Sequence, residues 1–401
     1  MKKYFSPSKL RWVLYIAFGE AIALFTILSI VFVILPFSSN RYIRGSDYVS
    51  YVTGAAIVRD GKGSTLYDID TQTVYQRELV KPYRKQIILP YRYLPFLALF
   101  FVPFSWLDFR VGYFVYLGIQ LLLVGLLSVF VIRIFRRVGR FVWAVLVPFS
   151  LLPISDSILW GQVTVFLTLV YFVFYWLETK GKSLLAGMVA GLFLIKPHLY
   201  LVGLPFWVLS SSRKKFFFFG NLLTVSVFLF ISFFISGVGV FKYPDFLFLT
   251  EHGQYGSHLQ FLPSLYSFLL FVSGNQKAAF LVNGVLFVVA FFLFWRRMKG
   301  KKQLSFVTAT LLVPVFAIHT NILDLTHVLL AMFLLWEASL KQDGWKSIIS
   351  LVFVILLYFS AAYCILGASI LTPLFLLTMG TGLLFFGSKL GLDKEPRSEL
   401  S

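Results

Sequence analysis

The apolar runs of this chain are long and numerous enough to make it a protein of the lipid bilayer. About 20 apolar residues span the hydrocarbon core as a helix, and long runs occupy 12–36, 111–134, 216–236, 278–295, 347–366 and 369–388. Shorter runs occupy 141–154, 163–178, 184–195, 199–209, 304–318 and 322–338. Only 13% of the 401 residues are charged and 59% are hydrophobic, whereas globular proteins average about 25% charged residues. The sequence therefore predicts an all-α polytopic membrane protein of about 12 transmembrane helices.

Two further apolar pieces, 93–106 and 262–273, are interrupted by Pro95, Pro103 and Pro263. Proline removes a backbone donor from a helix, so these pieces are expected to be re-entrant or partial helices, and whether they cross is left open. We expect one transmembrane domain over 1–388. Within it, 37–91 would be an outer loop with short amphipathic helices, and 389–401 would follow it as a polar cytoplasmic tail.

Basic residues cluster in short segments between the apolar runs, so the net charge of +19 does not indicate a nucleic-acid partner. Lys and Arg favour the cytoplasmic side of a membrane, close to anionic headgroups. Both termini lie inside when the short clusters are placed there, namely Lys2/Lys3/Lys9/Arg11, Arg133/Arg136/Arg137/Arg140, Lys180/Lys182, Arg213/Lys214/Lys215, Arg296/Arg297/Lys299/Lys301/Lys302 and Lys341/Lys346. The loop 37–91 also carries eight Lys and Arg, but the rule weakens for long loops.

The opposite, outer face then collects the polar breaks in the apolar pattern. These are the loop 37–91, the stretch 155–162, the segment 196–198, the loop 241–263 and the segment 319–321. The runs that flank the breaks are short, so each turn should lie below the membrane surface. Non-helical backbone at that depth must line a protein-walled or water-filled cavity. The sequence thus predicts one polar cavity that opens to the outside.

Two acidic residues lie in or directly after the first apolar run. Asp47 follows the run closely, and 46–60 predicts a short amphipathic helix with Ser46 or Asp47 as its N-cap. Asp47 is therefore either that cap alone or a functional carboxylate. Glu20 lies inside the run, and pairing within the bundle and a relay role are both open.

Lys196 and His198 interrupt a strongly apolar run on either side of Pro197. Ionisable side chains at membrane depth are costly unless they are paired, which favours a functional role. A lipid phosphate is the natural partner, because cations stabilise its charge as it departs. The alternative is a snorkelling lysine beside a structural proline kink.

Other polar side chains of these breaks have less specific patterns. His319 is followed by Asp324 and His327 at helical spacing, and pairing among the three is as good a hypothesis as function. Gln162 and Gln260 could donate hydrogen bonds to sugar hydroxyls or could cap helices. The Asp68-Ile69-Asp70 pattern occurs in metal-dependent sugar transfer, but three-residue acidic patterns are common, and no metal site is expected.

A series of short motifs runs along the chain in a fixed order. They are Asp47, Tyr51-Val-Thr-Gly-Ala-Ala, Gly63-Ser-Thr-Leu-Tyr67-Asp68, Tyr91-Arg-Tyr93-Leu-Pro95 with Pro103, Trp160-Gly161-Gln162, Ala186-Gly ahead of Lys196-Pro197, Gln260 with Ser264-Leu265, and Pro314 ahead of His319. In their order and spacing, these motifs resemble glycosyltransferase family 87, the polyprenyl-phosphate-mannose-dependent mannosyltransferases of the GT-C superfamily. The resemblance covers roughly residues 12–340. Leu94 departs from it where the family usually has proline, and Ile318 where it often has an aromatic residue.

The resemblance implies a GT-C-type bundle and a hexosyltransferase, which transfers a sugar (mannose in the family) from a polyprenyl-phosphate donor to an acceptor hydroxyl with inversion. Asp47 matches the catalytic aspartate and would act as general base. The donor phosphate would bind Lys196, His198, Arg92 and Arg44, and the sugar or acceptor would bind Gln162, Gln260, His319 and Tyr51.

The implied partners are the lipid-linked donor, a glycan or glycolipid acceptor and membrane lipids, with no cofactor. The site is expected on the non-cytoplasmic face, in the plasma membrane of a prokaryote. The main alternative is a secondary transporter or a lipid-linked-glycan flippase, because broken helices with polar residues near the midplane are also typical of transporters. A transporter would favour two repeated halves, and 12–200 does not align with 201–390 in that way.

Overall fold

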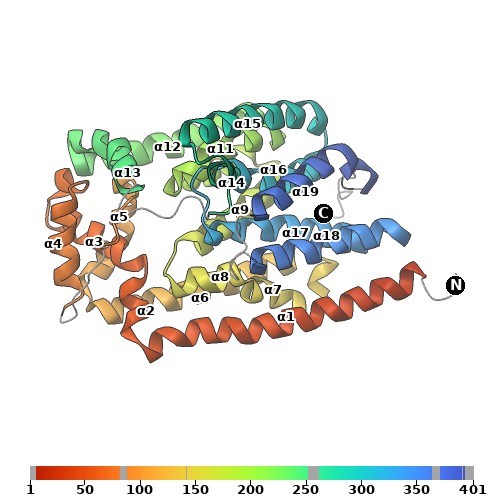
Figure 1. The fold of residues 1–401 in the computed structure, drawn as a ribbon, viewed down its shortest axis with the longest axis horizontal. Helices are drawn as coiled ribbons and strands as arrows, with labels where there is room; N and C mark the ends of the chain where they lie inside the picture. Colours follow the sequence, from red (N-terminus) through yellow and green to blue (C-terminus); the bar gives the residue numbers. More distant parts are fainter. Residues whose placement is uncertain are drawn as a thin grey trace.

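The computed structural model describes residues 6–81, 88–140, 142–251, 262–363, 371–390 and 392. Over these residues the regular secondary structure is helical throughout, which confirms the all-α prediction. Long helices lie side by side in a bundle, and α1 begins at the same end of it as α19 finishes (Figure 1). The opposite end carries a group of shorter helices, α2 to α5 and α13.

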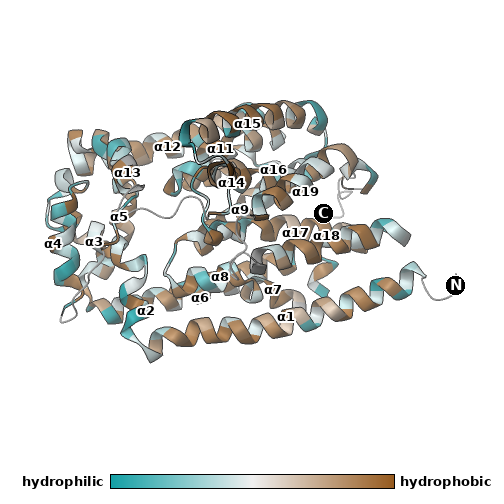
Figure 2. Cartoon of the chain, in the orientation of Figure 1, coloured by the Kyte–Doolittle hydropathy of each residue, from teal (hydrophilic) through white to brown (hydrophobic). Residues whose placement is uncertain are grey.

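Among the residues that the structure describes, six helical stretches are long and apolar enough to cross a membrane. They are α1 (Pro7–Ser38), α6 (Phe109–Ile134), α12 (Lys214–Ser236) continuing to Leu247, α15 (Gln276–Met298), η9 (Ile322–His327) with α17 (Val328–Leu340), and α19 (Thr372–Phe386) continuing to Leu390. Shorter apolar helices include α5 (Pro95–Phe101) with η2 (Val102–Trp106), α9 (Thr164–Thr179), α10 (Ser183–Ala190) with η5 (Gly191–Ile195), α16 (Lys302–Phe316) and most of α18 (Gly344–Tyr363). Hydrophobic residues dominate the long helices, and hydrophilic residues concentrate in α4 and at helix ends and turns (Figure 2). The count of about 12 crossings stays a prediction.

The run 141–154, expected as one spanning helix, is a series of short pieces. These are η4 (Val142–Val145), α7 (Val147–Ser150) and α8 (Leu152–Leu159). Pro153 lies in the first turn of α8, where its missing N–H costs nothing, although it could not donate within a helix that continued from α7. The chain therefore approaches the polar stretch 155–162 through a broken path.

The basic turns meet at the end of the bundle where α1 begins. Glu337 of α17 accepts hydrogen bonds from the backbone N–H of Arg137, at 3.2 Å, and of the next residue. Glu178, at the end of α9, accepts from Ser211 Oγ at 2.7 Å, and its carbonyl accepts from Lys302 Nζ at 2.6 Å. These contacts join turns from several parts of the chain, and the orientation of this end in the membrane stays a prediction.

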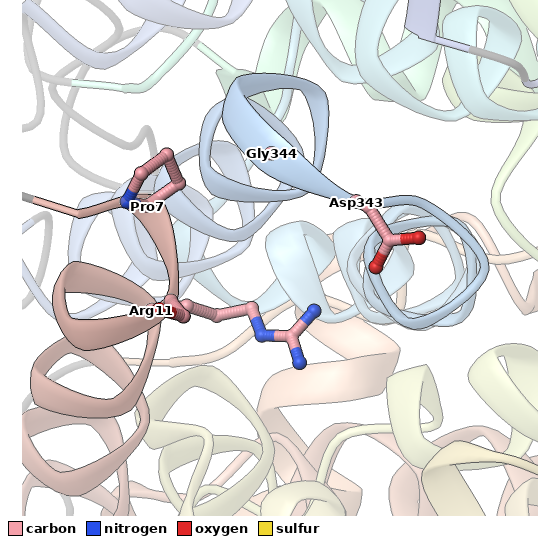
Figure 3. A pocket seen from close by; sticks show the side chains of 5 residues that line it. Pro7, Arg11, Asp343 and Gly344 are labelled. Atoms are coloured by element: carbon pink, nitrogen blue, oxygen red, sulfur yellow. The ribbon is translucent and has the colours of Figure 1, made fainter.

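A pocket of about 290 Å³ opens at this same end, between the start of α1 and the turn before α18 (Figure 3). Its lining residues are Pro7, Ser8, Arg11, Asp343 and Gly344. The full length of α1, about 48 Å by its helical rise, separates this pocket from Asp47. It is therefore not part of the candidate site.

Short helices form within the loop 37–91, as predicted. They are α2 (Asn40–Gly45), α3 (Tyr48–Arg59), η1 (Gly63–Thr65) and α4 (Ile69–Leu79). The amphipathic character expected for 46–60 is wrong, because every residue of α3 from Tyr48 to Ile57 is buried. Helices α4 and α5, together with η2, pack around α3. α3 is thus buried under α4, α5 and η2.

Candidate functional site

Asp47 precedes α3, but its side chain does not cap the helix. Its backbone is already helical (φ −66°, ψ −16°), whereas a capping residue is typically extended, with its side chain over the helix end. Instead Oδ2 accepts a hydrogen bond from the Gln162 side-chain amide. The backbone N–H of Asp47 donates to the Trp160 carbonyl at 2.8 Å. The half-buried carboxylate is therefore held against the turn between α8 and α9.

That turn depends on Gly161, which has φ +65°. A Cβ added there would lie 3.0 Å from the Cβ of Tyr48, so both the backbone conformation and the close contact favour glycine. The tight turn presses against the start of α3 and places Gln162 beside Asp47. This explains in physical terms why Trp160-Gly161-Gln162 precedes α9.

Two tyrosines support Gln162 from behind. Tyr51, which is fully buried, donates to Gln162 Oε1 at 3.3 Å, and its hydroxyl lies 3.0 Å from that of Tyr93. Burial, then the neighbouring Tyr93 and Asp47, raise the pKa of Tyr51 well above its usual value, so its hydroxyl stays a donor. With its amide oxygen engaged, Gln162 turns its NH₂ group toward Asp47. Tyr51 therefore orients Gln162, although its own side chain is not accessible to a substrate.

A second polar group centres on a buried ion pair. Lys196, in the turn between η5 and α11 (Pro197–Ser210), donates from Nζ to Asp324 Oδ1 at 2.6 Å and to Thr164 Oγ1 at 3.4 Å. The Lys196 side chain is 5% exposed and that of Asp324 is 1% exposed. Asp324 Oδ2 accepts from the backbone N–H of Asn321 at 2.9 Å, which closes a capping box at the start of η9. Such a pair is tolerated in a low-dielectric interior only when its hydrogen bonds are satisfied.

Two histidines complete this group. His198 Nε2 lies 3.5 Å from Asp324 Oδ2, and the His198 ring meets His319 edge to face at 5.8 Å between centroids. Asp324 is thus paired with Lys196 and His198 of another segment. His327 does not join this pairing, and its Nδ1 lies 3.1 Å from the Thr326 hydroxyl. His198, whose side chain is 24% exposed, presents more surface than Lys196 does.

The group around Asp47 and the group around Lys196 both contact the short segment 162–164. Gln162 binds Asp47, and Thr164 accepts from Lys196; their Cα atoms are at most about 7 Å apart along the chain. The structure therefore brings together Asp47, Lys196 and the histidines, as the sequence predicted for the polar breaks.

The remaining candidates lie at the edge of this site or outside the described residues. Arg92 precedes Tyr93 and donates from Nε to Thr250 Oγ1 at 3.1 Å, which ties it to α13 (Tyr243–Glu251). Arg44 lies in the last turn of α2, with its Nε 3.3 Å from the Asn40 carbonyl. Gln260 falls outside the residues that the structure describes.

The acidic pattern at 68–70 is accounted for by helix capping. Asp68 accepts from the backbone N–H of Asp70 and Thr71, both at 3.3 Å, and from Thr71 Oγ1 at 2.6 Å. It is thus the N-cap of α4. Over the described ranges, the His, Cys, Asp and Glu side chains form no group of three or more that could hold a metal ion.

Asp156 is a second carboxylate near Asp47 that was not among the sequence candidates. It lies on α8, one turn before Trp160. Its pKa is raised to about 6, chiefly by burial and also by the charge of Asp47, against a side-chain hydrogen bond with Trp160 that lowers it. Its sequence signal was its place within the polar stretch 155–162.

The raised pKa of Asp156 predicts a pH-dependent effect on stability. An aspartate in the unfolded chain has a pKa of about 3.9, so the folded protein should lose stability as pH rises from about 4 to about 6. Asp156→Asn removes this loss. We expect the variant to be about 3 kcal/mol more stable than wild type at pH 7 and equal to it at pH 4. Thermal unfolding in detergent between pH 4 and 8 measures this difference.

Asp68→Asn is the matched control, because asparagine also caps helices and the pKa of Asp68 is lowered, chiefly by its Thr71 hydrogen bond. It should give no gain at pH 7. If Asp156→Asn is no more stable than wild type at pH 7, ionisation of Asp156 does not destabilise the folded protein, and the prediction is wrong.

The comparison with protein families matches the chain over more than half its length. The model of Glycosyltransferase family 87 matches residues 91–323. This range contains Gln162, Lys196, His198 and His319, whereas Asp47 precedes it. No curated protein and no solved structure matches the chain.

Proposed function

We propose that this chain, which belongs to glycosyltransferase family 87, transfers a sugar from a polyprenyl-phosphate donor to an acceptor hydroxyl. Family membership and the six apolar stretches make it a membrane glycosyltransferase. The proposal rests on one observation above all: segment 162–164 holds the Asp47 carboxylate on one side and the Lys196–Asp324–His198 group on the other. Sugar transfer from a phosphate needs a base for the acceptor and basic side chains for the phosphate, and here both lie on either side of one segment.

In the proposed reaction, Asp47 accepts the proton of the acceptor hydroxyl. The hydroxyl oxygen attacks the anomeric carbon as the bond from that carbon to the phosphate oxygen breaks, and the bonding electrons leave with the phosphate. A single displacement inverts the anomeric configuration. General-base assistance contributes about 10²- to 10⁴-fold, and alignment of the two substrates contributes further. Gln162 holds the carboxylate in place during this step.

The donor phosphate would lie against His198, the more exposed member of the basic group. Lys196 would act on the phosphate through its charge and not by direct contact, since its Nζ is already bonded to Asp324. Arg92 and Arg44 are proposed as additional phosphate contacts at the rim, and His319 and Gln260 as sugar or acceptor contacts. For Tyr51 we propose support of Gln162 in place of direct sugar binding, because it is fully buried.

The donor is proposed to be a lipid-linked sugar, mannose in particular, and the acceptor a glycan or glycolipid. If the basic end of the bundle faces the cytoplasm, α9 sets the site about 23 Å away from it, toward the non-cytoplasmic face. Nucleotide sugars are cytoplasmic, so a site on that face needs a lipid carrier for its sugar. The basic end itself fits anionic headgroups of the inner leaflet.

Purified protein incubated with a panel of polyprenyl-phosphate sugars tests this function. We expect release of polyprenyl phosphate, dependent on an added glycan or glycolipid acceptor and highest with mannose. If no member of the panel releases polyprenyl phosphate with any acceptor, the proposed donor class is wrong.

Gln162→Leu tests whether the orientation of Asp47 matters. Leucine keeps the volume and loses both amide bonds, so Asp47 should become misplaced. A misplacement of about 1 Å can lower the rate about 100-fold, and we expect a loss of that size in turnover with nearly unchanged donor affinity. Gln120→Leu in α6 is the control, because neither amide atom of this buried glutamine has a partner among the described residues. Equal turnover in the two variants would contradict the role of Gln162.

A further inference from the structure

Glu20 lies on the side of α1 that faces away from the protein. The buried residues of α1 are on the other side, and they pack against α7, α8 and α18. At 100° per residue, Glu20 lies directly opposite Phe18, Ile22 and Ser29. Its neighbours on this outer side are exposed, with Ile16 at 61% and Ile27 at 62%. Figure 1 shows α1 along one edge of the bundle, with the other helices on one side of it. The roles left open for Glu20, pairing within the bundle or a relay, therefore do not fit its position.

Glu20 also lies deep along the spanning helix. Its Cα is about 13 Å beyond Arg11 and about 24 Å before Pro36 by helical rise, within a hydrocarbon core about 30 Å thick. No hydrogen bond or ion pair joins Glu20 to any residue in the described part of the chain. A carboxyl group facing hydrocarbon without a partner is costly. Something outside this chain should therefore satisfy it.

The outer face of α1 has a spacing that suits packing against another helix. Val13, Glu20, Ile27 and Ile34 recur every seven residues, and so do Ile16, Ala23, Ile30 and Phe37, all of them exposed. Apolar residues at these positions are expected of any helix that faces lipid. Glu20 distinguishes this face, because one polar residue in a heptad seam fixes register and partner. Ala23, one turn away, lets a second backbone approach closely.

We propose that this face of α1 binds α1 of a second copy of the protein, in parallel, with the two Glu20 carboxyl groups hydrogen-bonded to each other. A two-fold axis places each residue opposite its own counterpart, and copies inserted in one orientation make the helices parallel. A carboxyl pair is self-complementary, since one carboxyl that carries a proton donates and the other accepts. The exposed Lys and Arg of the described spans lie toward helix ends, so these spans offer Glu20 no cation at its own depth.

Cysteine cross-linking in lipid vesicles tests the dimer. The single cysteine, Cys364, is first replaced by serine, and the purified protein is reconstituted in phosphatidylcholine and phosphatidylglycerol vesicles. Ile27→Cys lies in the proposed seam, whereas Leu28→Cys is a lipid-exposed control (39% exposed) rotated by 100° around the helix. We expect a disulfide-linked dimer from Ile27→Cys and little from Leu28→Cys. Equal cross-linking at the two positions would overturn the proposal.

The role of Glu20 is tested in the Ile27→Cys background. Glu20→Leu should weaken dimerisation about 5- to 30-fold, the range for interhelical hydrogen bonds in membranes. Glu20→Gln should retain most of it, because two amides can also bond to each other. Unchanged cross-linking in Glu20→Leu, or a wild-type protein that stays monomeric in vesicles and pairs only with a different protein in native membranes, would refute the self-association. Unfolding temperatures equal to wild type would confirm that both variants fold.

Discussion

Asp47→Asn is expected to abolish sugar transfer while the protein still folds and binds its donor. Asparagine fills nearly the same volume, and the backbone bond from residue 47 to the Trp160 carbonyl does not depend on the side chain. The amide cannot accept the acceptor proton, so at least the 10²- to 10⁴-fold contribution of a general base should be lost. Release of polyprenyl phosphate measures turnover, and binding of a labelled donor measures affinity.

Asp60→Asn provides the control for this result. Asp60 follows the same helix at its other end, where it bonds to Arg59 at 2.8 Å and to the Tyr75 hydroxyl at 2.9 Å. Its loss should leave turnover within a few-fold of wild type. If Asp47→Asn keeps wild-type turnover, Asp47 is not the base; if it loses donor binding as well, its role lies in the binding of substrate.

The sequence predicted where the site would form, because the cost of polar groups in lipid is a local property. Each polar break, at Gln162, Lys196 or His319, is flanked by apolar runs, and polar backbone in hydrocarbon must line a shared cavity. The structure places these three breaks and Asp47 together. That prediction needed hydropathy and chain order, without knowledge of any side-chain contact.

The pairing of side chains was not predictable in the same way. Asp324 shares a helical spacing with His327, which favoured a local interaction, but its partner is Lys196, 128 residues earlier. A local pattern carries no information about which distant segment packs beside it. The burial of α3 was missed for the same reason, because its apolar and small residues are compatible with a surface helix until α4 and α5 cover it.

The ion pair between Lys196 and Asp324 leads to a second large expected effect. Removal of one partner leaves the other as an uncompensated buried charge, which typically costs about 3–5 kcal/mol. Lys196→Met and Asp324→Leu should each lower the free energy of unfolding by that amount. The exposed pair of Lys81 and Glu78, at 2.7 Å, offers the control, since Lys81→Met should cost less than about 1 kcal/mol.

The double variant Lys196→Met/Asp324→Leu separates stability from catalysis. Apolar side chains of similar volume can replace a buried ion pair at little or no cost, so the double variant should recover most of the stability that each single variant loses. Its turnover should stay low, because His198 loses the carboxylate that faces its Nε2 and the donor phosphate loses the field of Lys196. Thermal unfolding and release of polyprenyl phosphate, measured on the same preparations, follow the two properties. Recovery of both would mean that the pair serves folding alone and that the basic group acts through His198 without it. Recovery of stability without turnover would assign the pair to the donor side of the reaction, opposite Asp47.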